Sequence, residues 1–130
     1  MMAVSLVLVS HSHELVHGLK KLLEQVQPDV AIAVAGGTDE NDIGTSALKI
    51  KDAIESVYSE DGVALLFDLG SARLNAEMAV EMLDGNANVT ICDAPLVEGA
   101  YAAVVQAGIG GSLGEVADAA SQAKTFSKLS

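Results

Sequence analysis

Four short apolar segments recur along the chain, and a stretch with helical spacing follows each of them. The segments are predicted strands, because near-continuous apolar runs of this length are typical of parallel strands buried on both faces. The stretches between them place apolar residues three and four positions apart, as on one face of a helix. The strands are expected at Val4–Val9, Val30–Val34, Val63–Phe67 and Val89–Cys92.

Residues that start or stop helices delimit the segments between these strands. Pro28 cannot continue the first helix, and Pro95 is expected at the first position of the fourth, where a missing N–H is tolerated. Gly108 is expected to cap the end of that helix, and Ser112–Glu115 has the spacing of a capping box. The apolar helical positions lie within Leu15–Val26, Ala47–Val57, Ala72–Leu83 and Val97–Ala107, and in a last helix at Val116, Ala119, Ala120 and Ala123, which are expected to face inward.

This alternation predicts a doubly wound α/β fold with three layers, α/β/α, and a mainly parallel sheet in strand order 2-1-3-4. A chain of 130 residues is expected to form a single domain, residues 1–130, because cores rarely divide below about 200 residues. Sheets of this kind bind ligands beyond the carboxyl ends of their strands, where the strand order reverses. A functional site is therefore expected at that edge, where all four strand ends are small or polar.

Charge and composition exclude several classes of function. The formal net charge is −11, with no basic stripe, which argues against nucleic acid as a partner. The acidic excess serves solubility or steers the chain toward basic protein surfaces. No apolar run approaches the ~18 residues that span a bilayer, and the first ten residues lack the features of a signal peptide, so neither membrane insertion nor export is expected. Cys92 is the sole cysteine, which suits a buried thiol in a reducing cytoplasm.

His11 is the most chemically capable residue at the four strand ends. A neutral imidazole is a nucleophile at cytoplasmic pH, and a phosphoramidate formed on it can be passed on. Asp68 ends the third strand, next to the first in the expected order, and is the candidate to fix the imidazole tautomer. Ser12 and the backbone amides around Gly37-Thr38 and Gly70-Ser71 are expected to surround the phosphoryl oxygens.

Other interpretations of the same residues stay open. His11 could be an ordinary polar residue at the start of a helix, and Asp68 could cap the helix that follows it. His13 and His17 are four residues apart and could chelate a metal together with His11. No cysteine or further histidine supports that site, so no metal is expected.

Four further alternatives are disfavoured by the sequence. Arg73 could neutralise phosphate, but an exposed arginine at a helix start is the simpler interpretation. Ser71 lacks the second glycine of a nucleophile elbow, which disfavours a hydrolase. The first strand ends in Ser10-His11 without the acidic pair of a receiver domain, and the few aromatic residues disfavour a flavin site.

Five sequence blocks occur in an order that resembles a known family. They resemble the phosphoryl-donor subunits of bacterial dihydroxyacetone kinases that are driven by phosphoenolpyruvate through the sugar phosphotransferase system. Their domain is in turn similar to mannose-type enzyme IIA domains. The resemblance runs from Val4 to about Ala120. The blocks are Val9-Ser10-His11-Ser12, Ala35-Gly36-Gly37-Thr38, Ile43-Gly44-Thr45-Ser46, Asp68-Leu69-Gly70-Ser71-Ala72 and Ala94-Pro95-Leu96-Val97-Glu98-Gly99-Ala100.

The resemblance implies a phosphotransferase subunit with a phosphohistidine intermediate. Phosphohistidine on the carrier protein HPr would donate to His11, and phospho-His11 would phosphorylate ADP held by the nucleotide-carrying kinase subunit. A third subunit would bind dihydroxyacetone, so this chain would hold no cofactor itself. The same resemblance implies that Asp68 orients His11, that Ser12, Gly37, Thr38, Gly70 and Ser71 contact phosphate, and that the chain forms a homodimer.

Two other functions remain possible from the sequence. A mannose-type enzyme IIA would pass phosphate to a IIB domain for sugar import, and the Asp68–Ala72 and Ala94–Gly99 blocks favour the kinase subunit over it. A flavodoxin-like binding module would use the same crevice without covalent chemistry, and would tolerate replacement of His11. The sequence does not select the imidazole nitrogen that is phosphorylated.

Overall fold

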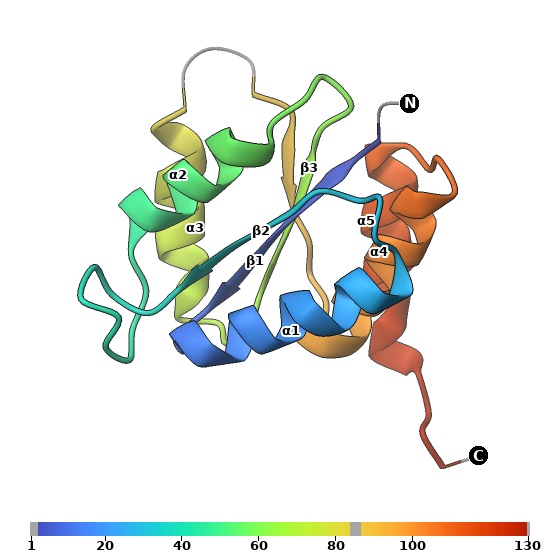
Figure 1. Ribbon diagram of the computed structural model, residues 1–130, viewed down its shortest axis with the longest axis horizontal. Helices are drawn as coiled ribbons and strands as arrows, with labels where there is room; N and C mark the ends of the chain where they lie inside the picture. Colours follow the sequence, from blue (N-terminus) through green and yellow to red (C-terminus); the bar gives the residue numbers. More distant parts are fainter. Residues whose placement is uncertain (1–2, 84–86, 130) are drawn as a thin grey trace.

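The computed structural model describes residues 3–83 and 87–129 and is built around one parallel sheet (Figure 1). Strands β1 (Ser5–Ser10), β2 (Ile32–Gly36), β3 (Val63–Phe67) and β4 (Val89–Ile91) pair in the order β2-β1-β3-β4. All three pairings are parallel. The predicted fold class and strand order are therefore confirmed, with each strand within two residues of its expected bounds.

Five α-helices lie on the two faces of the sheet within the described residues (Figure 1). The helices α1, α4 and α5 pack on one face, and α2 and α3 pack on the other. A short 3₁₀ turn, η1 (Ala123–Thr125), follows α5. The sheet is thus the middle of three layers. The helices are α1 (His13–Val26), α2 (Ala47–Val57), α3 (Ala72–Glu81), α4 (Leu96–Gly108) and α5 (Leu113–Gln122).

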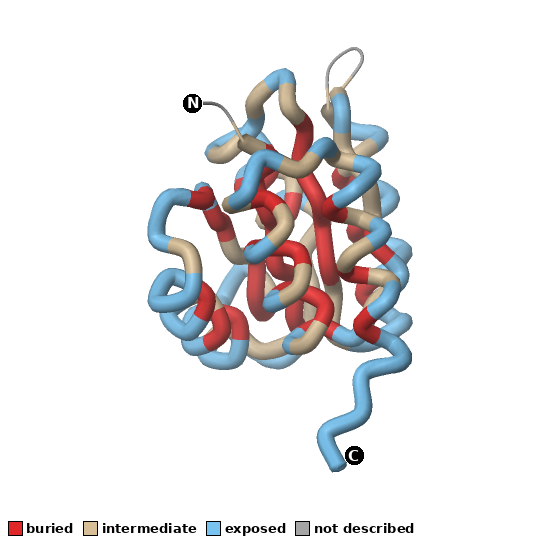
Figure 2. Tube along the Cα trace, turned by 90° about the vertical axis from the view of Figure 1, so that its right-hand side faces the viewer, coloured by how far each residue is buried: buried red, intermediate tan, exposed pale blue. Residues whose placement is uncertain are grey.

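Strand β1 is the centre of the core. Successive side chains of a strand point to opposite faces, so Leu6 and Leu8 pack under α1 and α4 while Val7 and Val9 pack under α2 and α3. All four are fully buried, and Figure 2 shows buried stretches of the chain running through the middle of the molecule. Burying one such side chain stabilises the fold by roughly 1.5–3 kcal/mol. The carboxyl end of β1 is consequently held in a fixed position.

Helix α1 buries a different face from the one that its leucines suggest. Val16, Leu19 and Leu23 are buried, whereas Leu15 and Leu22 are 44% and 53% exposed. The helix begins at His13, where the Ser12 hydroxyl accepts a hydrogen bond from the amide of Leu15. That start rotates the buried face by one residue, because each helical residue turns the chain by about 100°.

The ends of α4 differ from the expected ones by about one residue, whereas α2 has its expected bounds and α3 ends two residues early, at Glu81. Pro95 is the N-cap of α4 instead of its first residue, and buried Leu96 replaces the expected Val97 as the inward position. Gly108 is the last residue of that helix, and Gly110 takes the positive φ of 88°. The capping box at Ser112 is confirmed. Val116, Ala120 and Ala123 are buried as predicted, and Ala119 is half-buried.

Candidate active site

His11 leaves the carboxyl end of β1 at the point where the strand order reverses. The connection from β1 runs outward to β2, and the connection from β3 runs outward to β4 on the other side. The loops after β1 and β3 therefore diverge, and sheets of this kind bind ligands in the crevice at such a point. His11 follows β1 and Asp68 follows β3, so the topology brings the two side chains together at this crevice.

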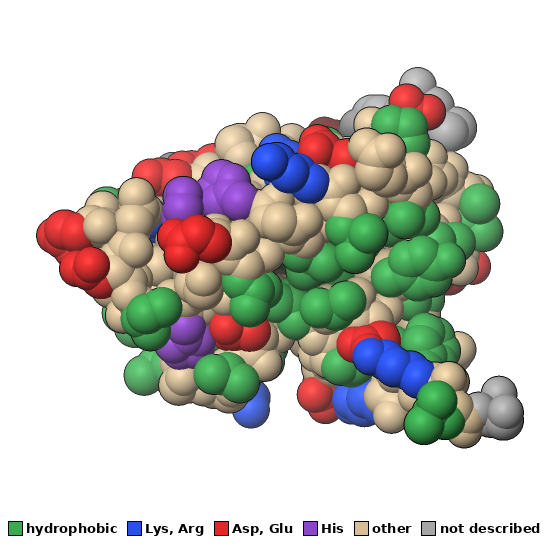
Figure 3. All heavy atoms as spheres, turned by 60° about the horizontal axis from the view of Figure 1, so that its bottom comes forward, with side chains coloured by type: hydrophobic (Ala, Val, Ile, Leu, Met, Phe, Trp, Pro, Cys, Tyr) green, Lys and Arg blue, Asp and Glu red, His purple; other side chains and the backbone are tan. Residues whose placement is uncertain are grey.

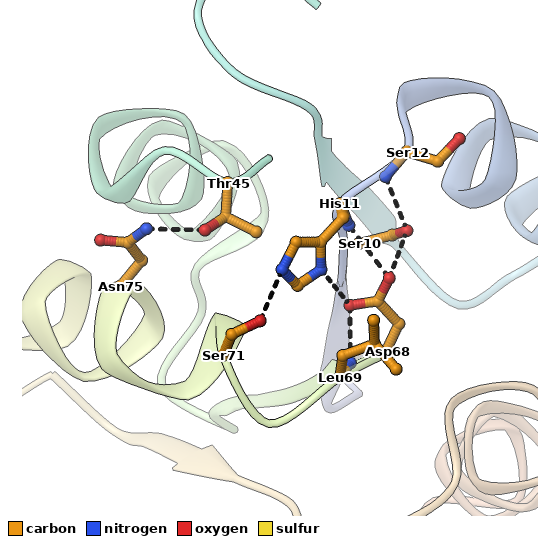
Figure 4. Close-up of polar contacts among 8 residues, drawn as sticks. All are labelled: Ser10, His11, Ser12, Thr45, Asp68, Leu69, Ser71 and Asn75. Atoms are coloured by element: carbon orange, nitrogen blue, oxygen red, sulfur yellow. Dashed lines mark hydrogen bonds and ion pairs between the residues drawn. The ribbon is translucent and has the colours of Figure 1, made fainter. Parts of the chain in front are cut away.

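The Asp68 carboxylate accepts four hydrogen bonds at the base of the crevice (Figure 4). Its Oδ2 accepts from the Ser10 hydroxyl at 2.8 Å and from the His11 amide at 3.0 Å. Its Oδ1 accepts from the Leu69 amide at 2.7 Å and lies 2.9 Å from Nδ1 of the His11 ring. Asp68 does not cap α3, whose N-cap is Ser71. The geometry thus favours orientation of His11 over the capping alternative.

The environment of Asp68 keeps its carboxyl group ionised at neutral pH. Burial removes water from the carboxylate and by itself would raise its pKa. The hydrogen bonds from the amide and ring of His11, from Ser10 and from Leu69 outweigh this effect, and together they hold the pKa of Asp68 below its ordinary value. An ionised carboxylate can only accept hydrogen bonds, so the proton between the two groups belongs to Nδ1 of His11.

The second ring nitrogen of His11 is the one that can act as a nucleophile. With the proton on Nδ1, Nε2 carries a lone pair, and the Ser71 hydroxyl donates to it at 2.8 Å (Figure 4). The histidine side chain is 21% exposed. The nitrogen opposite Asp68 thus lies at the crevice, and only a hydroxyl that can rotate away is bonded to it.

The start of α3 adds backbone donors beside this nitrogen. Within the part of the chain that the structure describes, the amides of Gly70 and Ser71 have no hydrogen-bond partner. A β-carbon at Gly70 would meet no atom within 4 Å, so the backbone there is open to approach. Free amides at the start of a helix favour an anion. These two predicted residues therefore lie where a phosphoryl group on His11 could use them.

The other three predicted phosphate contacts have partners of their own. The Ser12 hydroxyl caps α1, and its amide donates to the Ser10 hydroxyl at 3.0 Å. The Gly37 amide donates to the Ser10 carbonyl at 3.2 Å, and the Thr38 amide donates to the Asp42 carbonyl at 2.9 Å. These hydrogen bonds argue against the prediction that Ser12, Gly37 and Thr38 hold phosphate, because their amides are already used.

Three polar residues near His11 were not singled out from the sequence. Ser10 is fully buried and joins the Asp68 carboxylate to the Ser12 amide. A serine at the end of an otherwise apolar strand is the signal that could have identified it. Asn75 donates to the Thr45 hydroxyl at 2.6 Å, and Figure 4 shows this pair on the side of the His11 ring away from Asp68. Their spacing in the sequence gives no sign of the contact.

The alternative metal site is not assembled. His13 and His17 stack with their ring centroids 4.1 Å apart, but His11 is bonded to Asp68 and Ser71 instead of joining them. Among residues 3–83 and 87–129, no group of three or more His, Cys, Asp or Glu side chains could hold a metal ion. Arg73 pairs with Glu77 at 3.1 Å and is largely exposed.

Two further observations concern the surroundings of the chain. Cys92 is buried and unpaired, and burial raises the pKa of its thiol to about 11. It is therefore an inert thiol at neutral pH, as the sequence predicts. None of the helices in the described ranges is both long enough and apolar enough to cross a membrane.

Comparison with known proteins gives relatives over most of this chain. The family model described as "PTS system fructose IIA component" (EIIA-man) matches residues 5–117. The phosphoryl donor subunit DhaM of the PEP-dependent dihydroxyacetone kinase of Escherichia coli is 45% identical over 119 residues, which are 87% of this chain and 25% of that protein. The chain thus spans about a quarter of that relative. A second DhaM, from Listeria innocua, is 44% identical over 79% of this chain and 85% of its own length.

Solved structures share the architecture. The crystal structure of EF1359, a protein of unknown function, has a TM-score of 0.79 and 34% identity, and the match covers 93% of this chain and 95% of that one. The dihydroxyacetone kinase of C. freundii in complex with AMP-PNP and Mg²⁺ has a TM-score of 0.69 over 92% of this chain and 25% of its own. At 20% identity the second match concerns the fold alone.

Proposed function

Because this chain belongs to the family of phosphotransferase-system IIA components that includes the phosphoryl donor subunits of dihydroxyacetone kinase, we propose that it carries a phosphoryl group on Nε2 of His11. The group comes from phosphohistidine on HPr and goes to ADP held by the nucleotide-carrying kinase subunit. The chain itself binds no cofactor. Its role is to bring one activated phosphoryl group from one protein to another.

The contact of His11 Nδ1 with Asp68 Oδ1, at 2.9 Å, is the observation that carries this proposal. It holds the proton on Nδ1 and leaves the lone pair on Nε2, which is the form of imidazole that attacks phosphorus. Asp68 remains ionised because its hydrogen bonds lower its pKa. The carboxylate therefore stabilises the positive charge that develops on the ring as the N–P bond forms.

In the loading step, Nε2 of His11 attacks the phosphorus of the donor's phosphohistidine. The new N–P bond forms as the N–P bond of the donor breaks, and the donor imidazole keeps the electron pair. The Ser71 hydroxyl, which donates to Nε2 in the free protein, turns to a phosphoryl oxygen. The amides of Gly70 and Ser71 add donors, since phosphoryl transfer depends mainly on positioning and charge stabilisation.

In the unloading step, a β-phosphate oxygen of ADP attacks the same phosphorus from the outside of the crevice. The N–P bond on His11 breaks, its electron pair returns to Nε2, and ATP forms on the partner subunit. Asp68 retains its hydrogen bond to Nδ1–H throughout, so no proton has to enter or leave the ring.

The proposal also covers the assembly of the chain and its compartment in the cell. A homodimer is the proposed assembly, and the exposed apolar stripe of Leu74 and Met78 on α3 and Met82 at its C-terminal cap is one surface able to support it. The cytoplasm is the proposed compartment, because the unpaired thiol of Cys92 suits a reducing environment. Sedimentation of the purified chain tests the dimer.

The proposal is tested by transfer of label from phosphoenolpyruvate. The chain, His11→Gln and His13→Gln are each incubated with enzyme I, HPr and ³²P-labelled phosphoenolpyruvate. Acid-labile, base-stable label is expected on the parent and on His13→Gln, which alters a neighbouring histidine, and is expected to be absent from His11→Gln. Label on all three proteins would move the chemistry away from His11. Absence of label with active donors would instead favour a binding module without covalent chemistry.

The acceptor is identified in a second stage. The labelled chain is mixed either with the ADP-loaded kinase subunit or with a mannose-type IIB domain. Label is expected to leave the chain and appear in ATP in the first mixture and to remain on the chain in the second. Transfer to the IIB domain instead would assign the chain to sugar import.

A further inference from the structure

The unpaired cationic side chains of this acidic protein gather on one side of the molecule. Of the seven Lys and Arg residues, four form ion pairs with carboxylates: Lys51, Arg73, Lys124 and Lys128. The other three, Lys20, Lys21 and Lys49, have no such pair within the described residues. All three lie close enough to His17 for their charges to affect its pKa. Burial first, and then the charges of His13, Lys20, Lys21 and Lys49, lower the pKa of His17.

A cavity of about 450 Å³ lies beside these cations, along the open edge of the sheet. Strand β2 is an edge strand, and the cavity runs along it between α1 and α2. Figure 3 shows histidine side chains gathered beside a Lys or Arg side chain on this face. His13 and His17 line the cavity, whereas His11 does not and is bonded to Asp68 and Ser71, so the cavity is separate from the His11 crevice. Its lining includes His13 and His17 from α1, Asn41, Lys49, Asp52 and Ser56 from α2 and the loop before it, and residues 33–36 of β2.

The edge of β2 contributes backbone groups to this cavity. Leu6 donates to the Ala31 carbonyl and Gly37 donates to the Ser10 carbonyl, so the odd-numbered residues of this segment bond to β1. The even-numbered residues, Val34 and Gly36, then point away from β1. Lys49 Nζ donates to the Gly36 carbonyl at 3.1 Å, as this alternation requires.

The two ends of the cavity differ in chemistry. At the Gly36 end, the bonds that Lys49 Nζ makes within the described residues go to neutral oxygens, those of Gly36 and of Asn41 at 2.6 Å, and not to a carboxylate. His13 lies at the same end, because its Cα is only 2.8 Å from where a β-carbon of Gly36 would be. Asp52 and Ser56 lie one and two turns further along α2, and the Asp52 carboxylate can accept hydrogen bonds from hydroxyl groups.

We propose that this cavity binds a small phosphate monoester whose organic part carries hydroxyl groups. The phosphate lies at the Gly36 end, where the Lys49 ammonium and the imidazoles of His13 and His17 donate to its oxygens. The hydroxyl groups lie toward Asp52 and Ser56. A divalent metal on the histidine pair is disfavoured, because the Lys49 ammonium lines the same cavity and repels a cation. Binding is non-covalent and does not depend on the chemistry proposed for His11.

The test uses glycerol 3-phosphate as the probe and the ring signals of the three histidines as reporters. Saturable shifts of the His13 and His17 signals in NMR titrations are expected, at concentrations that leave the His11 signal unchanged. Lys49→Gln is expected to weaken binding at least tenfold. Lys51→Gln is the matched control, because Lys51 lies on the same helix but pairs with Glu55 at 3.1 Å, and it is expected to bind as the parent does.

Two further measurements separate the proposal from simple charge attraction. His17→Gln, at an exposed position, is expected to weaken binding without affecting folding. Asp52→Asn is expected to weaken glycerol 3-phosphate and to leave or improve the affinity for inorganic phosphate. The proposal is overturned if only the His11 signal moves, if Lys49→Gln and Lys51→Gln bind equally, or if sodium chloride at equal ionic strength produces the same shifts.

Discussion

Two loops leave the carboxyl edge of the sheet with the same kind of dipeptide, a glycine followed by a hydroxyl residue, yet only one of these dipeptides bonds to the His11 ring. The β3–α3 loop places the Ser71 hydroxyl 2.8 Å from Nε2. In the β2–α2 loop, the Thr38 hydroxyl instead accepts from the Asp42 amide at 3.2 Å. The residue types at a strand end therefore do not by themselves decide which loop builds the site.

The difference between the loops follows from their length and their strand. The β3–α3 loop, residues 68–71, has room for little bonding within itself beyond that of the Leu69 amide to the Asp68 carboxylate, and its strand lies beside β1 at the switch point. Its polar groups consequently turn to His11. The β2–α2 loop, residues 37–46, is long enough to fold back, and the amides of Thr38 and Asn41 find partners within it. Its hydrogen bond to His11 is a backbone one, from the Gly44 amide to the His11 carbonyl at 2.9 Å.

The two glycines serve correspondingly different purposes. Gly37 has a positive φ of 79°, and a β-carbon there would lie 2.9 Å from the Asp42 carbonyl. Gly70 has no positive φ and has open space around it. The first glycine is needed by the turn and the second leaves room for a ligand.

The contact between the β3–α3 loop and His11 is tested most strongly by Asp68→Asn. An amide in place of the carboxylate can hold the ring in the wrong tautomer and cannot stabilise the charge on it. Phosphorylation of His11 is expected to slow by about 100- to 10,000-fold. Rapid-quench measurement of phosphoryl transfer from phospho-HPr gives the rate.

The matched control for this prediction is Asp93→Asn. Asp93 follows β4 at the same edge of the sheet but pairs with Lys124 at 2.7 Å and not with His11. Its replacement is expected to leave the transfer rate unchanged. Similar losses in both variants would mean that negative charge at this edge matters, and not the contact with the ring.

The β2–α2 loop is tested by Gly37→Ala, which should affect stability and not chemistry. A left-handed alanine costs about 1–2 kcal/mol, and the close Asp42 carbonyl adds to this. Urea unfolding measures the loss, and the transfer rate of the folded protein is expected to stay near that of the parent. Gly18→Ala is the control, because Gly18 has free space and helical backbone. A slower transfer rate in Gly37→Ala with unchanged stability would show that Gly37 takes part in phosphoryl transfer.

The hydroxyl of the β3–α3 loop is tested by Ser71→Ala. Removing one hydrogen bond to Nε2 is expected to slow loading by about 2- to 10-fold, since such a bond contributes about 0.5–1.5 kcal/mol. Ser71→Thr keeps the hydroxyl and should recover most of the rate. Equal loading rates for Ser71→Ala and Ser71→Thr, whether both match the parent or both are slower, would show that the hydroxyl takes no part in transfer.

The fold and the centre of the site were predictable because they depend on patterns that are local in the sequence. The apolar runs locate the strands, and the neighbourhood of β1 and β3 brings Asp68 to His11. The buried face of α1 was less predictable. Whether Leu15 or Val16 faces the core depends on where the helix starts, and the Ser12 cap sets that start.

The phosphate contacts were the least predictable part of the site. Whether an amide is free depends on what the rest of its loop does, and Thr38 shows this, since its partner Asp42 is part of the same loop. Asn75 on α3 reaches Thr45 in the loop just before α2, so only the packing of α2 against α3 brings the two together. Patterns of residue types do not contain that information.

The smallest expected effect comes from Gly70→Ala, and it addresses the comparison between the two glycines directly. Because the backbone there is unstrained and a β-carbon would meet nothing within 4 Å, stability should hold or rise by about 0.4–1 kcal/mol through reduced freedom of the unfolded chain. Loading from phospho-HPr should slow by less than in Ser71→Ala, since the added methyl narrows the approach of a partner without removing a donor. The same urea and rapid-quench measurements apply. A loss of stability as large as that of Gly37→Ala would show that both glycines serve the turn, and the distinction between the two loops would then rest on their hydroxyl groups alone.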